Sequence, residues 1–167
     1  QEQTFEVLPD PRSASTAADY AAQFEFVIEA RDLLSRTHDE IVRVRAVRDQ
    51  LETVRERLVD GHGDGDVETP LTDAIDAFVE RITAIEEALY QTKNESRQDP
   101  LNYPIRLNNK LTSLMRGVAA GDAAPTAQAL AVKAELSAAI ETELENLNEL
   151  WREALPELEA RLAGEEL

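Results

Sequence analysis

The chain has 167 residues, of which 43% are hydrophobic and 31% charged, and its formal net charge is −17. This composition is typical of a single folded domain, and a strongly acidic chain repels phosphates, which argues against a nucleic-acid partner. The absence of cysteine excludes disulfides, thiolate metal sites and cysteine nucleophiles. No apolar run reaches the length of a membrane span, so we expect no membrane insertion.

The acidic surface contains few lysines, because most of the basic residues are arginines. Such a surface holds hydration water and is typical of a salt-adapted protein, although an ordinary acidic, arginine-rich bacterial protein has the same composition. The source of the chain therefore stays open between these two alternatives.

The first twelve residues, "QEQTFEVLPDPR", differ from the rest of the chain. Thr4 to Leu8 have the pattern of a short strand, and Pro9 and Pro11 end it. Because one strand is not stable alone, we expect residues 1–12 to be an end strand or linker from an upstream β domain, followed by a helical bundle over residues 13–167. The alternative is an extended tail that lies on the bundle.

A long helix is predicted from Thr16, which has the features of an N-cap paired with Asp19, to about Val59. At 1.5 Å per residue, an unbroken helix of this length would be roughly 60 Å long, with a bend near Thr37-His38 as an alternative. Its apolar residues recur every three or four positions and predict one continuous buried stripe. They are Tyr20, Phe24, Val27, Leu34, Ile41, Val44, Leu51, Val54 and Leu58.

A second helix is predicted to begin with Thr69 as its N-cap and Pro70 as its first residue. Its apolar residues follow a 4-3-4-3-4 spacing, which is a heptad seam. They are Leu71, Ile75, Phe78, Ile82, Ile85 and Leu89. Because the loop before this helix is short, the two long helices are expected to be antiparallel neighbours.

Two further helices complete the prediction. The first is shorter and ends at Gly121, and its apolar residues are Ile105, Leu107, Leu111, Leu114, Met115 and Val118. The last begins at Pro125, and Pro156 should kink or restart it. Its stripe consists of Leu136, Ile140, Leu144, Leu147, Trp151, Leu155 and Leu158. The predicted fold is all-α, an antiparallel up-and-down bundle of about four helices, three of them long.

Residues 60–66, "DGHGDGD", carry acidic residues at the spacing of a calcium-binding loop. The twelfth position of such a loop requires a bidentate Glu, and here it is Leu71, so a solvated hairpin loop is the better interpretation. His38 and His62 are too few for a histidine-rich metal site. The carboxylates of "IEEAL" and "ELENLNEL" are expected on outward faces. We therefore assign no catalytic residue, metal ligand or cofactor.

The stretch "SRQDPLNYPIRLNNKL", residues 96–111, is rich in amides and contains two prolines that favour turns. Its side chains can satisfy the backbone groups that two helix ends leave unpaired. A second interpretation is a docking surface with Arg97, Tyr103 and Arg106 as anchors, and a catalytic role is the weakest because no base and nucleophile are paired. The candidate residues are Lys93, Asn94, Arg97, Gln98, Asp99, Asn102, Tyr103, Arg106, Asn108 and Asn109.

The segment "LYQTKNESRQDPLNYPIRLNNKLTSL" closely resembles one near the C-terminus of large bacterial proteins with sortilin-type propellers of BNR repeats, which are often named glycosyl hydrolases. The resemblance extends to "FEVLPDPR" and to "GDAAPTAQALAVKAELSAAIETELENL". It implies a propeller and a small β region before this bundle, and a secreted, periplasmic or cell-envelope location whose export signal lies upstream. The hydrolase name belongs to the propeller, and no catalytic residue of the family falls within these positions.

The resemblance implies a non-catalytic C-terminal helical bundle that serves as a structural or protein-interaction module. Its expected partners are the upstream propeller and β domain or another protein. One alternative is an accessory part of a glycoside hydrolase active site, to which Arg97, Tyr103 or Arg106 would contribute. The other is a self-associating coiled-coil scaffold that uses the seam from Leu71 to Leu89.

Overall fold

The computed structural model describes residues 2–8, 10–61 and 69–164, and these residues form helices and no strand. The α-helices are α1 (Ala17–Gly61), α2 (Pro70–Leu89), α3 (Leu107–Ala119), α4 (Ala127–Glu149) and α5 (Leu155–Ala163). A short 3₁₀ helix, Asp99–Leu101, lies between α2 and α3, and a π-helical turn, Leu150–Ala154, joins α4 to α5. The predicted all-α bundle is confirmed.

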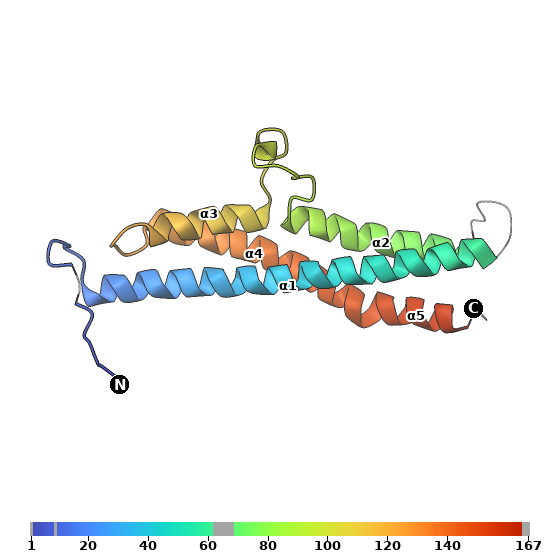
Figure 1. Ribbon diagram of the computed structural model, residues 1–167, viewed down its shortest axis with the longest axis horizontal. Helices are drawn as coiled ribbons and strands as arrows, with labels where there is room; N and C mark the ends of the chain where they lie inside the picture. The colour runs from blue at the N-terminus through green and yellow to red at the C-terminus, as the bar shows by residue number, and fades with distance from the viewer. Residues whose placement is uncertain (1, 9, 62–68, 165–167) are drawn as a thin grey trace.

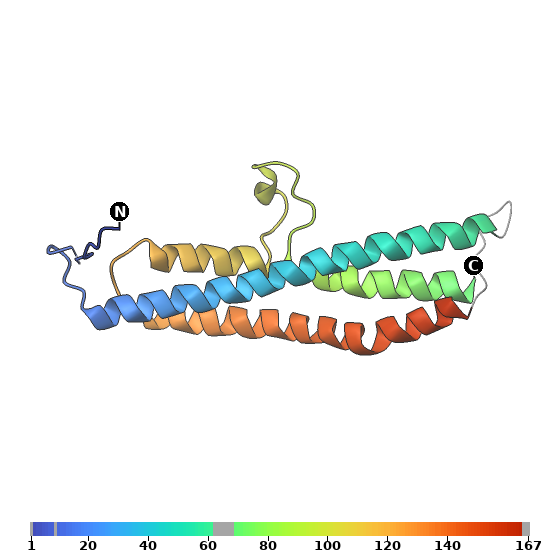
Figure 2. The ribbon, with the colours of Figure 1, turned by 60° about the horizontal axis from the view of Figure 1, so that its bottom comes forward.

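The helices are arranged as three long rods that run side by side (Figures 1 and 2). The first rod is α1, whose 45 residues give a length of roughly 68 Å. The second consists of α2 and α3, which lie end to end along α1, and the third consists of α4 and α5. The chain therefore runs up, down and up. The shorter helix that we expected as a fourth member extends the second rod.

The first rod is one uninterrupted helix from Ala17 to Gly61, so the helix has no break near Thr37-His38. Thr37 is buried, and its hydroxyl donates to the Leu33 carbonyl 2.8 Å away, within the helix. At the start of α1, the Thr16 N–H donates to the Asp19 carboxylate at 2.7 Å, and the Asp19 N–H donates to Thr16 Oγ1 at 3.3 Å. The predicted reciprocal cap is confirmed.

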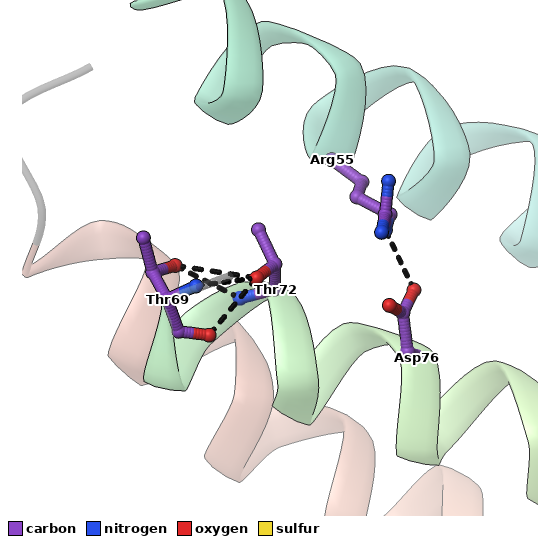
Figure 3. Close-up of polar contacts among 4 residues, drawn as sticks. All are labelled: Arg55, Thr69, Thr72 and Asp76. Atoms are coloured by element: carbon purple, nitrogen blue, oxygen red, sulfur yellow. Dashed lines mark hydrogen bonds and ion pairs between the residues drawn. The ribbon is translucent and has the colours of Figure 1, made fainter. Parts of the chain in front are cut away.

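The start of α2 also follows the prediction, with Thr69 as N-cap and Pro70 as the first helical residue. The Thr72 N–H donates to Thr69 Oγ1 at 3.2 Å, and the Thr69 N–H donates to Thr72 Oγ1 at 2.8 Å (Figure 3). An ion pair of 2.7 Å between Arg55 Nε and an Asp76 carboxylate oxygen joins α1 to α2 just beyond this cap (Figure 3). Residues 62–68, which include most of the glycine-aspartate loop, lie outside the described residues.

The core contains all six residues of the predicted α2 seam, which confirms that prediction. In α1, the prediction that Phe24 is part of the buried stripe is wrong, because its side chain is 65% exposed and Phe26 is buried instead. Residues two positions apart in an α-helix, such as Phe24 and Phe26, are about 200° apart around the helix axis. Only one of these two side chains can therefore face the core. Ile105 is also wrongly predicted as part of a buried stripe, since it precedes α3 and is 43% exposed.

The third rod begins at Ala127 rather than at Pro125, because the Thr126 hydroxyl caps it and accepts from the Ala129 N–H at 3.1 Å. The restart expected at Pro156 is confirmed. Proline lacks an N–H, and its ring crowds the carbonyl four residues earlier. The chain adapts by widening the helix, so that the Leu155 N–H donates to the Leu150 carbonyl, five residues back.

The strand expected at Thr4 to Leu8 is absent from the structure, in which residues 2–8 belong to no helix or strand and are exposed. A strand needs a hydrogen-bonded neighbour, and the bundle offers none to this segment. Beyond it, the Ser15 hydroxyl donates to the Asp122 carbonyl, which ties the start of the bundle to the loop between α3 and α4. The assignment of residues 1–12 to an upstream β domain stays a prediction.

Candidate interaction site

The second rod is interrupted in its middle, where residues 90–106 leave the bundle and return to it (Figures 1 and 2). We call these residues the projecting loop. Pro100 and Pro104 lie within it, and neither can donate the backbone hydrogen bond that a continuous helix would need. The break therefore arises from the same polar, proline-containing stretch that was predicted to form a turn.

The loop leaves α2 at Tyr90, whose side chain packs against α1. The Tyr90 N–H donates to the Glu86 carbonyl at 2.7 Å and ends the helix. Its ring meets the His38 ring edge to face, with 6.5 Å between centroids, and the Arg45 guanidinium lies 5.1 Å from the centre of the tyrosine ring. These contacts fix the direction in which the loop departs.

Gln91 joins the two ends of the projecting loop. Its buried side chain donates from Nε2 to the Pro104 carbonyl at 2.7 Å and accepts from the Lys93 N–H at 3.2 Å. On the other side of the break, Asn108 Nδ2 lies 3.4 Å from His38 Nε2. His38 of α1 therefore contacts a residue on each side of the break, Tyr90 and Asn108.

A buried ionic network lies one turn before the break. Glu86 is 1% exposed, and its carboxylate accepts from Arg45 Nε at 2.7 Å and from Arg48 Nη2. The expectation that the carboxylates of "IEEAL" face outward is wrong for this residue. The ion pair between Glu86 and Arg48 could have been predicted from helical spacing, because both side chains fall within apolar stripes. Glu86 lies at helical spacing from Ile82 and Leu89, and Arg48 lies at the same spacing from Val44 and Leu51.

The outer part of the loop is organised by Asp99. Its carboxylate accepts from the backbone N–H groups of Glu95 and Ser96 and from the Ser96 hydroxyl, each at 2.6 Å. The hydrogen bond from the Ser96 hydroxyl, followed by those from the two N–H groups, lowers the pKa of Asp99 below its ordinary value of 3.8. The carboxylate thus closes a small turn in its ionised form.

The predicted site residues divide into two groups. Those at the outer part of the loop are exposed except for Asp99, whereas those at its base are half-buried or buried. The exposed group is Lys93, Asn94, Arg97, Gln98, Asn102 and Tyr103. Asp99, Arg106 and Asn109 are half-buried and Asn108 is buried. His38, Tyr90 and Glu86 are also neighbours of this base, although the sequence pattern did not indicate them as part of the site.

The base has a polar interior. The Arg106 N–H donates to Asn109 Oδ1 at 3.4 Å where α3 begins. Arg106 Nε and Asn108 Oδ1 are buried and make no hydrogen bond within the part of the chain that the structure describes. Buried polar groups of this kind are uncommon in native proteins, and each adds to the free energy cost of the break.

Within residues 2–8, 10–61 and 69–164, no group of three or more His, Asp or Glu side chains is placed to hold a metal ion. None of the helices in these ranges is long and apolar enough to cross a membrane. In comparisons with known proteins, no protein-family model, no curated protein and no solved structure matches the chain.

Proposed function

We propose that this chain is a non-catalytic helical rod that serves as a structural and protein-interaction module, and that the projecting loop is its docking site. The observation that carries the proposal is the exposure of the loop on a fixed base. Gln91, His38 and Tyr90 hold the base, while Arg97 and Tyr103 lie outside it. A loop that interrupts a helical rod, and that costs buried unpaired groups, stabilises the fold less than a continuous helix would.

The resemblance of residues 89–114 to the C-terminal region of sortilin-type propeller proteins supports one context for this module. In that context the parent protein is exported and glycosyl-hydrolase-like, and the rod docks on its upstream propeller and β region. A long rod with a rigidly held side loop suits a brace, because it can contact a neighbouring domain at one defined point along its length.

Two other roles differ in how well they agree with the geometry. Self-association through the α2 seam has little support, because Ile75, Ile82 and Leu89 are fully buried within the chain itself. An accessory catalytic role would require Arg97 or Tyr103 to reach an active site on another domain, and their exposure allows that. Loss of turnover in the assembled protein, with docking intact, would favour this second role.

The proposal is tested by isothermal titration calorimetry of the chain against the separately expressed upstream propeller and β region. The variants are Arg97→Ala and Tyr103→Ala, and the control is Arg81→Ala, which removes an exposed arginine from α2. We expect each loop variant to weaken binding by about tenfold, which is about 1.4 kcal/mol, and the control to have no effect. Absence of binding by the wild-type chain, or equal effects of all three substitutions, would refute the docking role.

A further inference from the structure

The distribution of charge along the chain is uneven. Residues 100–121 contain no Asp or Glu, although 34 of the 167 residues of the chain are acidic. Residues 90–121 as a whole contain five basic residues against two acidic ones, a net charge of +3 in a chain whose total is −17. The five basic residues are Lys93, Arg97, Arg106, Lys110 and Arg116. We call them the basic strip, which covers the projecting loop and α3.

The basic strip differs from the other basic residues in its pairing. Elsewhere in the described ranges, seven of the twelve other Lys and Arg side chains form an ion pair with a carboxylate. Within the same ranges none of the five strip residues does. Four of them are exposed and Arg106 is half-buried. The strip therefore presents positive charge that the rest of the described chain does not neutralise.

Apolar side chains lie beside these charges. Leu101 is 88% exposed, Ile105 is 43% exposed and Tyr103 is 38% exposed, all on the projecting loop. On α3, Lys110, Ser113 and Arg116 recur every three residues and are exposed, so they share the solvent face of that helix. Interfaces are stabilised by apolar and aromatic anchors at their centre, with charges that orient the partner around them. This combination is present here.

We propose that the basic strip and its three apolar neighbours bind an acidic segment of a partner protein that carries apolar side chains among its carboxylates. This inference rests on the proposed docking function and adds the chemistry of the partner. Arginine forms paired hydrogen bonds with a carboxylate, which suits Arg97 and Arg106, and the apolar anchors need apolar surface to bury. Charge complementarity selects an acidic segment rather than a basic or neutral one.

The acidic remainder of the rod limits which polyanion can bind. Exposed charges more than about 8 Å apart are largely screened at physiological ionic strength, and the loop projects from the middle of the bundle (Figure 2), so a short acidic segment can contact the strip locally. A nucleic acid is a long, uniformly charged polyanion that would also meet the rest of the chain, which is strongly acidic outside the strip. It would gain little from Leu101 and Ile105, because phosphates do not bury apolar side chains.

The test uses fluorescence anisotropy of a short labelled peptide in which glutamates flank leucines. A matched peptide with Gln in place of Glu and a single-stranded oligonucleotide are the comparison probes. The variants of the full chain are Arg97→Glu with Lys110→Glu, and Leu101→Ser. The control is Arg81→Glu with Arg152→Glu, which introduces the same charge change at exposed positions outside the strip.

We expect the glutamate peptide to bind the wild-type chain, and the charge reversal in the strip to weaken that binding by about tenfold or more. The Leu101→Ser substitution and added salt should each weaken the binding by a smaller factor. The control should differ from wild type by far less. Equal binding of the glutamine peptide, equal loss in the control, or tighter binding of the oligonucleotide would overturn the inference. Because the substituted side chains are exposed, unchanged urea midpoints are expected and confirm that the variants are folded.

The two proposals can fail separately. If the upstream region binds the chain but charge reversal in the strip leaves that binding unchanged, the partner chemistry is wrong and the docking function stands. If the glutamate peptide binds the strip but the upstream region does not bind the chain, the chemistry stands and the proposed partner is wrong.

Discussion

The buried carboxylate of Glu86 should be the most sensitive electrostatic point of the bundle. Substitution of both partners, Arg45→Met with Arg48→Met, leaves a side chain that is 1% exposed without a cation. Each charged hydrogen bond contributes about 1.5–3 kcal/mol, and an uncompensated buried charge costs about 3–5 kcal/mol. We therefore expect the double variant to lose about 3–5 kcal/mol of unfolding free energy, which for a chain of this size is a fall in Tm of about 6–20 °C.

Removing Glu86 instead of its two arginine partners should cost less unfolding free energy. In the single variant Glu86→Met, the arginines remain, but Arg45 is 48% exposed and Arg48 is 21% exposed, so water can solvate both. Replacing a buried ion pair by apolar side chains of similar volume is often neutral or stabilising. We expect the triple variant, in which Glu86, Arg45 and Arg48 are all Met, to recover most of the stability that the double variant loses.

Urea unfolding followed by far-UV circular dichroism measures these differences, with Arg57→Met as a control at an exposed position of α1. Two results would refute the reasoning. One is a double variant that loses less than about 1 kcal/mol, the range of an exposed ion pair. The other is a triple variant as unstable as the double variant, because the loss would then come from packing rather than from an unpaired charge.

Three further predictions concern packing and the projecting loop. Ile82→Ala should cost about 2–5 kcal/mol in urea unfolding because Ile82 is fully buried, whereas Phe24→Ala should change stability by less than about 0.5 kcal/mol, and similar losses would contradict the core described above. Gln91→Ala should cost about 1–3 kcal/mol and speed amide exchange in the loop, because it removes the bond to the Pro104 carbonyl, and unchanged exchange would exclude that role. The pKa of Asp99 is lowered, so its contribution to loop order is present above its ordinary value of 3.8 and is lost as pH falls through the lower folded value. The amide proton of Ser96 should therefore shift with a midpoint below 3.8 in an NMR titration, and Asp99→Ala should abolish that shift.

The sequence by itself determined the helices and most of the core, because local rules govern them. The spacing of Leu71, Ile75 and Ile82 places them on one helix face, and an apolar face must be buried. The caps at Thr16 and Thr69 were predictable because they involve residues only three positions apart. Where the local pattern permitted two choices, as between Phe24 and Phe26, the packing of the neighbouring rods decided.

The candidate site was only partly predictable. Composition alone selected residues 93–109, because amides and prolines interrupt a helical pattern there. Its division into an exposed loop and a buried base was not predictable, since the base is built with His38 and Arg45 from a helix about fifty residues earlier in the chain. Contacts of that kind leave no periodic trace in a single sequence.

Only the tertiary structure decided that α2 and α3 form one interrupted rod rather than two members of a four-helix bundle. The sequence shows where a helix ends, because prolines, caps and turn residues act locally. The direction in which the next helix continues depends on which surface of α1 remains available to it. That surface is set by the packing of α1 against the third rod, which brings together residues more than a hundred positions apart. An example is Trp151 of the π-helical turn, whose Nε1 donates to the Glu40 carboxylate of α1 at 2.8 Å.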